Sequence, residues 1–146
     1  MLDHELLRYG YALLFLGVLV EADAFVRGGH WRTWDPTLLL GRELNGSTLG
    51  IAGYGAIGQA VAHRARAFGM KILAFTRNPK SGVELADKGR LLAESDFLSI
   101  HLPLTADTKH WLKAADLARM KPTSVLINTA RGGLVDQPAL VAALAQ

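Results

Sequence analysis

The sequence predicts an α/β fold in which helices cover both faces of a parallel sheet. Short apolar segments alternate with helical segments from residue 48 onward. Runs such as 124–128 (SVLIN) are almost continuously apolar, which is typical of strands buried on both faces. A glycine-rich turn joins the first of these strands to the helix after it. Strand–helix alternation of this kind favours a doubly wound sheet.

The composition is that of an ordinary globular chain and excludes several other classes. The 146 residues are enough for one domain, half of them are hydrophobic, and a fifth are charged. The net charge of +3 is spread along the chain, which argues against a nucleic-acid-binding arm and suits small anionic ligands. The absence of cysteine excludes disulfides and thiolate metal sites. We expect no bound metal and a cytoplasmic location.

The first part of the chain is predicted to be one long helix over residues 3–28, followed by a loop over 30–47. The helix is apolar on almost every side in its middle and should therefore be buried on every side. Its uncharged run, Tyr9–Val20, is too short to span a membrane. A secretory signal is the alternative, but the acidic residues before this run argue against it. Trp31 and Trp34 in the loop are expected to be packing anchors.

The elements after residue 47 follow from apolar runs and from capping and breaking residues. Strands are expected at Thr48–Gly53, Lys71–Thr76, Asp96–His101 and Thr123–Asn128. Helices are expected at Ala56–Phe68, 83–88, 90–95, Ala114–Met120 and 136–144. An apolar stripe of the first of these helices should face the sheet, and it comprises Ile57, Val61, Ala65 and Phe68. Asp136 should cap the last helix, with Pro138 in its first turn.

The turn Gly53-x-Gly55-x-x-Gly58 predicts a dinucleotide site because it lies directly between a strand and a helix. Gly53 permits the tight turn, Gly55 lets the backbone approach a pyrophosphate, and Gly58 lets the helix pack closely on the strand. The helix N-terminus offers free N–H groups to the phosphates. A glycine-rich turn without a ligand is the alternative, whereas a P-loop is excluded because no Gly-Lys-Ser/Thr follows. We therefore predict a partial Rossmann-type dinucleotide-binding domain over 46–146, preceded by a crossover and dimerisation segment over 1–45.

The residues after the second strand favour NADP(H) over NAD(H). An acidic residue at this place accepts hydrogen bonds from the ribose 2′-hydroxyl of NAD. Thr76 occupies the expected position here, and Arg77 follows it. A hydroxyl and an arginine suit a 2′-phosphate, and Lys80 can add a further charge. Binding of NAD, with Arg77 as a solvated surface charge, is the alternative.

Three longer segments resemble the cofactor domain of the D-isomer-specific 2-hydroxyacid dehydrogenases. They are LLGRELNGSTLGIAGYGAIGQAVAHRARAFGM, LLAESDFLSIHLPLTADTKHWL and MKPTSVLINTARGGLVDQPALVAAL. The resemblance covers residues 13–145 and is greatest to the glyoxylate/hydroxypyruvate reductase branch that prefers NADPH. It implies an oxidoreductase that reduces small 2-oxo acids such as glyoxylate or hydroxypyruvate with NAD(P)H.

The resemblance also implies roles for individual residues. Arg131 matches the catalytic arginine that holds the substrate's carboxylate and carbonyl oxygen. Other matched positions line the cofactor, and these are Leu102, Pro103, Thr108, Asn128, Thr129 and Ala130. Ala56 and Ile57 stand where relatives have Arg-Ile against the pyrophosphate, so phosphate binding here should depend more on backbone N–H groups. Residues 3–44 correspond to a homodimer interface.

The sequence also departs from the family pattern. The family's catalytic histidine and the glutamate that orients it are not matched, and His101, at a strand end, is a weak substitute as proton donor. A short edge strand near Lys88–Arg90 is expected to be deleted. Three interpretations follow: a truncated chain without turnover of its own, an enzyme completed by another chain, or a non-enzymatic binding module of the co-repressor type. We favour a cofactor-binding part that is inactive alone, with neither nucleic acid nor membrane as partner.

Overall fold

The computed structural model describes residues 19–34, 38, 41–78 and 81–145. The chain divides into two compact units, Met1–Arg42 and Glu43–Gln146, and each is described here by itself. In the first unit, residues 19–27 are helical, and the helix ends at two glycines, of which Gly29 has a left-handed φ of +72°. The predicted helical segment over residues 3–18 lies outside the described residues.

Within the single chain, the described part of this helix is not buried, so its expected burial depends on a second subunit. Leu19, Val20 and Val26 are 49%, 68% and 52% exposed, and Trp31 and Trp34 are 50% and 76% exposed. The tryptophans are therefore not packing anchors within this chain. Asp23 and Arg27 form an exposed ion pair of 2.7 Å on the surface of the same helix.

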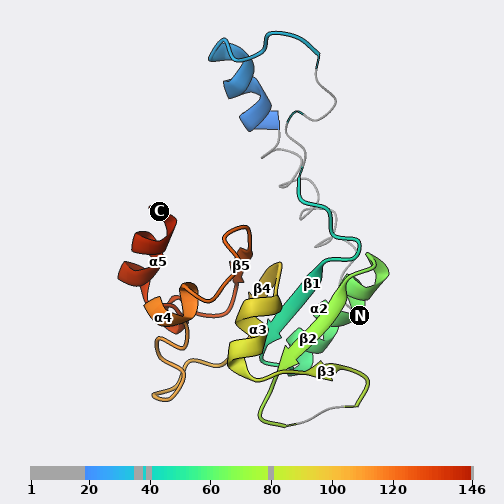
Figure 1. The fold of residues 1–146 in the computed structure, drawn as a ribbon, viewed down its shortest axis with the longest axis vertical. Helices are drawn as coiled ribbons and strands as arrows, with labels where there is room; N and C mark the ends of the chain where they lie inside the picture. Colours follow the sequence, from blue (N-terminus) through green and yellow to red (C-terminus); the bar gives the residue numbers. More distant parts are fainter. Residues whose placement is uncertain (1–18, 35–37, 39–40, 79–80, 146) are drawn as a thin grey trace. The chain divides into compact units, whose positions relative to one another are not determined.

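The second unit is built around a five-stranded parallel sheet (Figure 1). Its strands are β1 (Thr48–Ala52), β2 (Lys71–Phe75), β3 (Glu84–Leu85), β4 (Phe97–Ile100) and β5 (Val125–Asn128). Their order in the sheet is β3-β2-β1-β4-β5, and every neighbouring pair is parallel. The chain thus adds β2 and β3 on one side of β1 and then crosses back to add β4 and β5 on the other side. This confirms the predicted doubly wound parallel sheet.

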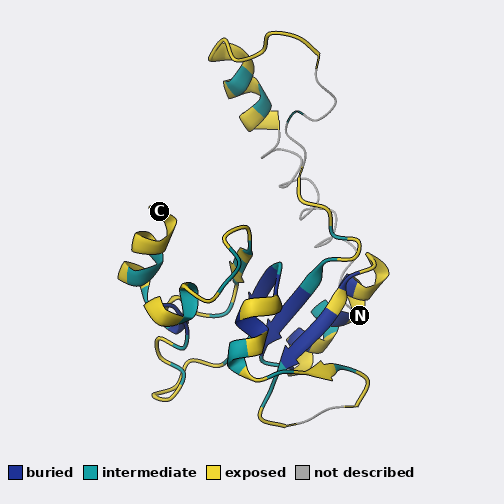
Figure 2. Cartoon of the chain, viewed as in Figure 1, coloured by how far each residue is buried: buried dark blue, intermediate teal, exposed yellow. Residues whose placement is uncertain are grey.

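Two hydrophobic cores lie on the two faces of the sheet, because alternate strand residues point to opposite sides. Helix α2 (Ala56–Ala67) packs with Leu49 and Ile51 of β1 on one face. Helix α3 (Lys88–Glu94) and the buried Leu112 and Leu134 pack on the other face. Burial is concentrated in β1, β2 and β4, whereas β3 and β5 are more exposed (Figure 2).

The contact face of α2 agrees only in part with the predicted stripe. Ala65 is buried and Val61 packs against the core, as expected. The buried residues are Gly58, Ala62 and Ala65, whereas Ile57 and Phe68 are 67% and 55% exposed. Small residues also contact the sheet where α2 lies close to β1, and a pattern of large apolar side chains does not reveal them. A Cβ on Gly58 would overlap the carbonyl oxygen of Gly53.

The expected deletion of the edge strand and the expected helix over 83–88 are both wrong. Residues Glu84 and Leu85 form β3, which pairs with Leu73 and Ala74 of β2. The amide of Ala86 extends this pairing by donating to the carbonyl of Ala74 over 2.9 Å. A strand of two residues is too short to produce a recognisable alternation in the sequence. The helical turn expected at 90–95 is part of helix α3, which begins two residues earlier, at Lys88, and is capped by Asp87.

The last elements are α4 (Ala114–Leu117), β5, the 3₁₀ helix η1 (Gly132–Leu134) and α5 (Gln137–Leu144). Helix α4 is shorter than predicted because the amides of Arg119 and Met120 bond three residues back, which tightens the chain into a turn. The predicted cap of α5 is confirmed, since the Asp136 carboxylate accepts from the amide of Ala139. Among the described residues, no helix combines the length and the hydropathy that crossing a membrane requires.

Candidate functional site

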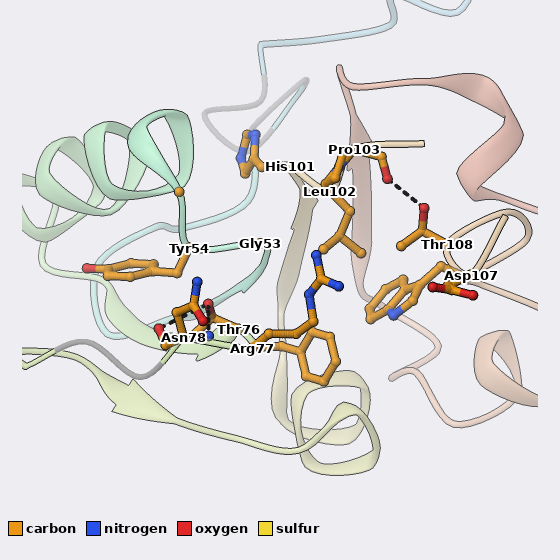
Figure 3. Close-up of a pocket in the computed structure, with 13 residues that line it drawn as sticks. Gly53, Tyr54, Thr76, Arg77, Asn78, His101, Leu102, Pro103, Asp107 and Thr108 are labelled. Carbon is orange, nitrogen blue, oxygen red and sulfur yellow. Dashed lines mark hydrogen bonds between the residues drawn. The ribbon is translucent and has the colours of Figure 1, made fainter. Parts of the chain in front are cut away.

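The candidate site is a cleft at the carboxyl edge of the sheet, above the junction of β1 with its neighbours (Figure 3). Strand order reverses between β1 and β4, and ligands of open α/β sheets bind outside the strand ends at such a point. The cleft has a volume of about 410 Å³. Its lining residues are Gly53, Tyr54, Gly55, Phe75, Thr76, Arg77, Asn78, His101, Leu102, Pro103, Asp107, Thr108 and Trp111.

The structure requires glycine at two of the three glycine positions of the turn, for different reasons, and does not require it at the third. Gly53 has a φ of +101°, and a Cβ there would lie 2.7 Å from the carbonyl oxygen of His101. Gly58 allows the close approach of α2 to β1 described above. Gly55, in contrast, has a φ of −82°, and a Cβ on it would meet nothing within 4 Å. The folded chain itself therefore does not require glycine at position 55, and the open space in front of it suits an incoming ligand.

The N-terminus of α2 beside Gly55 has the properties of an anion site. No side chain caps this helix end, and its first turn contains no acidic residue. Ala56 and Ile57 at its start are both exposed. Ala56, Ile57 and Gly58 do not line the cleft, but they directly follow Gly55, which does. The free N–H groups and the helix dipole at this end meet no competition from a carboxylate of the first turn. These features fit the pyrophosphate of a dinucleotide.

A polar turn follows β2 at the other side of the cleft. The Thr76 hydroxyl accepts from the amide of Asn78 and donates to its carbonyl, both over 3.3 Å. This turn directs Arg77 into the cleft (Figure 3). Thr76 thus shapes the turn, and Arg77 supplies the positive charge at the strand end.

The opposite wall comes from the loop after β4, where Leu102, Pro103 and Thr108 line the cleft as expected. The Thr108 hydroxyl donates to the carbonyl of Pro103 and accepts from the amide of Thr105 over 2.8 Å. These bonds close the loop on itself. Thr108 therefore shapes the wall through the loop as well as contributing surface to it.

His101 lies at the end of β4 and lines the same cleft. Partial burial lowers the pKa of its imidazole below the ordinary value. Its Nε2 lies 2.9 Å from the Ser99 hydroxyl. The neutral imidazole is therefore favoured at physiological pH, and it is held in a hydrogen bond within the strand.

The structure separates the other predicted residues from this cleft. Asn128, Thr129, Ala130 and Arg131 follow β5 at the same edge of the sheet, but none of them lines the cleft. The Asn128 side chain forms two hydrogen bonds within this loop. It accepts from the amide of Ala130 over 3.1 Å and donates to the carbonyl of Arg131 over 2.9 Å. Arg131 is exposed, and its Nη1 donates to the carbonyl of Ala130. Arg131 is thus an exposed residue in the loop after β5, at the carboxyl edge of the sheet.

Sequence reasoning missed five of the lining residues, namely Tyr54, Phe75, Asn78, Asp107 and Trp111. Phe75 and Tyr54 belong to apolar runs and are expected in a core on that basis. Trp111 lies 34 residues after Arg77 (111 − 77), so nothing local connects the two. A search for aromatic residues at the ends of the predicted strands would have found Phe75 and Tyr54 but not Trp111.

The strand order, the glycine turn at the end of β1 and the open helix N-terminus together define a dinucleotide-binding domain. The family model of the D-isomer specific 2-hydroxyacid dehydrogenase NAD-binding domain matches residues 9–146. The chain belongs to this family, and its cofactor class is the nicotinamide dinucleotides.

Individual relatives agree with this assignment. The chain is 51% identical over 136 residues to a glyoxylate reductase of Thermococcus litoralis, covering 86% of this chain and 41% of that protein. It is 53% identical over 102 residues to a glycerate dehydrogenase of Methylorubrum extorquens, covering 70% and 32%. Among solved structures, the TT0316 protein of Thermus thermophilus matches with a TM-score of 0.79 and 48% identity, covering 87% of this chain and 41% of that one. The chain therefore spans less than half the length of these relatives.

Proposed function

We propose that this chain is the cofactor-binding part of an oxidoreductase that reduces small 2-oxo acids, and that it prefers NADP(H). The observation that carries the cofactor preference is Arg77, which extends into the cleft at the end of β2 where NAD-specific domains place a carboxylate. No acidic residue accompanies it in the turn over Thr76–Asn78. A guanidinium suits the dianionic 2′-phosphate of NADP and offers less to a neutral ribose hydroxyl.

Different residues would bind different parts of the cofactor. The pyrophosphate would lie against Gly55 and the first N–H groups of α2, and the adenosine ribose against Thr76 and Arg77. When bound, the nicotinamide supplies the hydride for reduction of a carbonyl carbon. Asn128, Thr129 and Ala130 would flank this ring from the end of β5.

Arg131 would bind the substrate. A guanidinium donates two parallel hydrogen bonds to a carboxylate and can polarise an adjacent carbonyl for hydride attack. The names of the relatives support glyoxylate and related 2-oxo or 2-hydroxy acids as the substrate class. The exposed position of Arg131 at the carboxyl edge of the sheet is compatible with this role.

Calorimetric titration of the chain with NADP⁺ and with NAD⁺ tests the proposal. We expect saturable binding of both, with NADP⁺ bound at least about tenfold more tightly because one charge-assisted bond is added. A chain that binds NAD⁺ more tightly than NADP⁺ contradicts the preference. A chain that binds neither contradicts the assignment of the cleft.

We also propose that residues 3–44 form a homodimer interface. The support is the exposure of large apolar side chains on the described part of this segment, including Val20 at 68% and Trp34 at 76%. Exposed large apolar side chains are a feature of interaction surfaces. Val20→Asp is expected to shift the chain from dimer to monomer in sedimentation velocity, and Val141→Asp, at an equally exposed valine of α5, should not. A monomeric wild-type chain at high concentration would refute the interface.

A further inference from the structure

Two aromatic side chains that are distant in sequence meet in the cleft. Phe75 is the last residue of β2, and Trp111 lies in the loop before α4. Both are half-buried and both line the cleft. Their ring centroids are 5.6 Å apart, with the ring planes tilted by 45°. Together they form an apolar corner beside the polar turn of Arg77.

Lys88 holds the Trp111 side of this corner. Its Nζ lies 4.8 Å from the centre of the Trp111 ring and also donates to the carbonyl oxygen of Trp111. The same Nζ forms an ion pair of 2.6 Å with Asp116 of α4, and the two side chains are only 30% and 16% exposed. A single ammonium group therefore fixes the indole ring, its backbone and the following helix at once. Cation–π and ion-pair contacts are stronger in such a partly desolvated position.

The position of the corner indicates what it can bind. The ribose of the adenosine half of a dinucleotide meets the chain just after β2, and Phe75 directly precedes that turn. A planar base attached to this ribose would extend over a surface within reach of Phe75 and Trp111. Aromatic side chains bind bases by stacking, and each stacked base gains affinity without hydrogen-bond readout.

We propose that Phe75 and Trp111 form the wall that binds the adenine base, and that Lys88 is the positioning residue that orients Trp111 for this contact. The inference rests on the proposed function, because it assumes that a dinucleotide enters the cleft. It extends that function by assigning the base to an aromatic corner and by giving α3 a part in cofactor binding.

Fluorescence of Trp111 tests the inference directly. Trp31 and Trp34 are replaced by phenylalanine in both wild-type and variant chains, so that Trp111 is the single tryptophan that remains. NADP⁺ and adenosine 2′,5′-bisphosphate are each expected to quench Trp111 emission on binding, since both contain the base. Nicotinamide mononucleotide, which lacks adenine, should leave the emission unchanged.

Substitutions of Lys88 test its role. Lys88→Met is expected to weaken NADP⁺ binding about fivefold or more and to reduce the quenching, because the indole loses its fixed orientation. Lys88→Arg retains the charge above the ring and should restore both readouts. Lys121→Met is the matched control, since Lys121 forms a similar half-buried ion pair of 2.9 Å with Asp96 at the amino edge of the sheet. That variant should bind and quench as wild type does.

The outcomes separate this inference from the proposed function. Binding of NADP⁺ by calorimetry with unchanged Trp111 emission would overturn the base wall and leave the proposed function intact. A Lys88→Met chain that binds and quenches like the Lys121→Met chain would overturn the role of Lys88. Failure of the wild-type chain to bind any dinucleotide would overturn the proposed function and the base wall together.

Discussion

Arg77→Ala is expected to weaken NADP⁺ binding by about 10- to 100-fold and to leave NAD⁺ binding within about twofold of wild type. The reason is that a charge-assisted hydrogen bond contributes roughly 1.5–3 kcal/mol. Only NADP carries the 2′-phosphate to which the guanidinium would bond, so only its affinity should fall. Calorimetric titration with both nucleotides gives the two changes in the same experiment.

The control for this experiment is Arg64→Ala. Arg64 is an exposed arginine of α2 whose Nη1 donates to the carbonyl of Ala60 within its own helix. Its loss changes the net charge of the chain by the same amount but removes nothing from the cleft. An equal loss of NADP⁺ affinity in both variants would attribute the effect to net charge and would argue against a direct contact of Arg77. A fall in NAD⁺ affinity at Arg77→Ala would argue against 2′-phosphate recognition.

Gly55→Ala is expected to separate cofactor binding from folding. A Cβ at this position meets nothing within 4 Å, and the φ of −82° suits any residue. Stability in urea should therefore change by less than about 1 kcal/mol, the scale of an altered helix cap. Dinucleotide affinity should fall by at least about tenfold, because the added methyl occupies the space that the pyrophosphate needs.

Gly58→Ala is the matched variant with the opposite outcome. Its Cβ would overlap the Gly53 carbonyl and come within 3.1 Å of the Ile51 side chain, so α2 must move away from β1. We expect a loss of about 3 kcal/mol in unfolding free energy, despite the better helix propensity of alanine. If the Gly55→Ala variant binds NADP⁺ as tightly as wild type, the pyrophosphate does not bind at this turn. Gly58→Ala with wild-type stability would show that α2 can shift without cost.

Local sequence determined much of the fold because the relevant signals lie within a few residues. The Gly53–Gly58 turn, the cap of α5 by Asp136 and the buried strands β1, β2 and β4 are each specified by short patterns, and the structure confirms all of them. The NADP preference likewise came from two adjacent residues, Thr76 and Arg77. That prediction remains to be tested by the titrations above.

Tertiary structure decided what depends on distances between segments. Gly58 and Ala62 belong to the contact face of α2 because the helix lies close to the sheet, and that separation is not visible in any single segment. Strand β3 exists because Glu84 and Leu85 lie beside β2, although two residues make no pattern. The corner of Phe75 and Trp111, fixed by Lys88, brings together β2, α3 and the loop before α4. By itself the sequence determined that a glycine-rich turn joins the first strand to its helix and where the charges lie, since these are local properties. Which side chains share the cleft is a property of packing, and only the folded chain decided it.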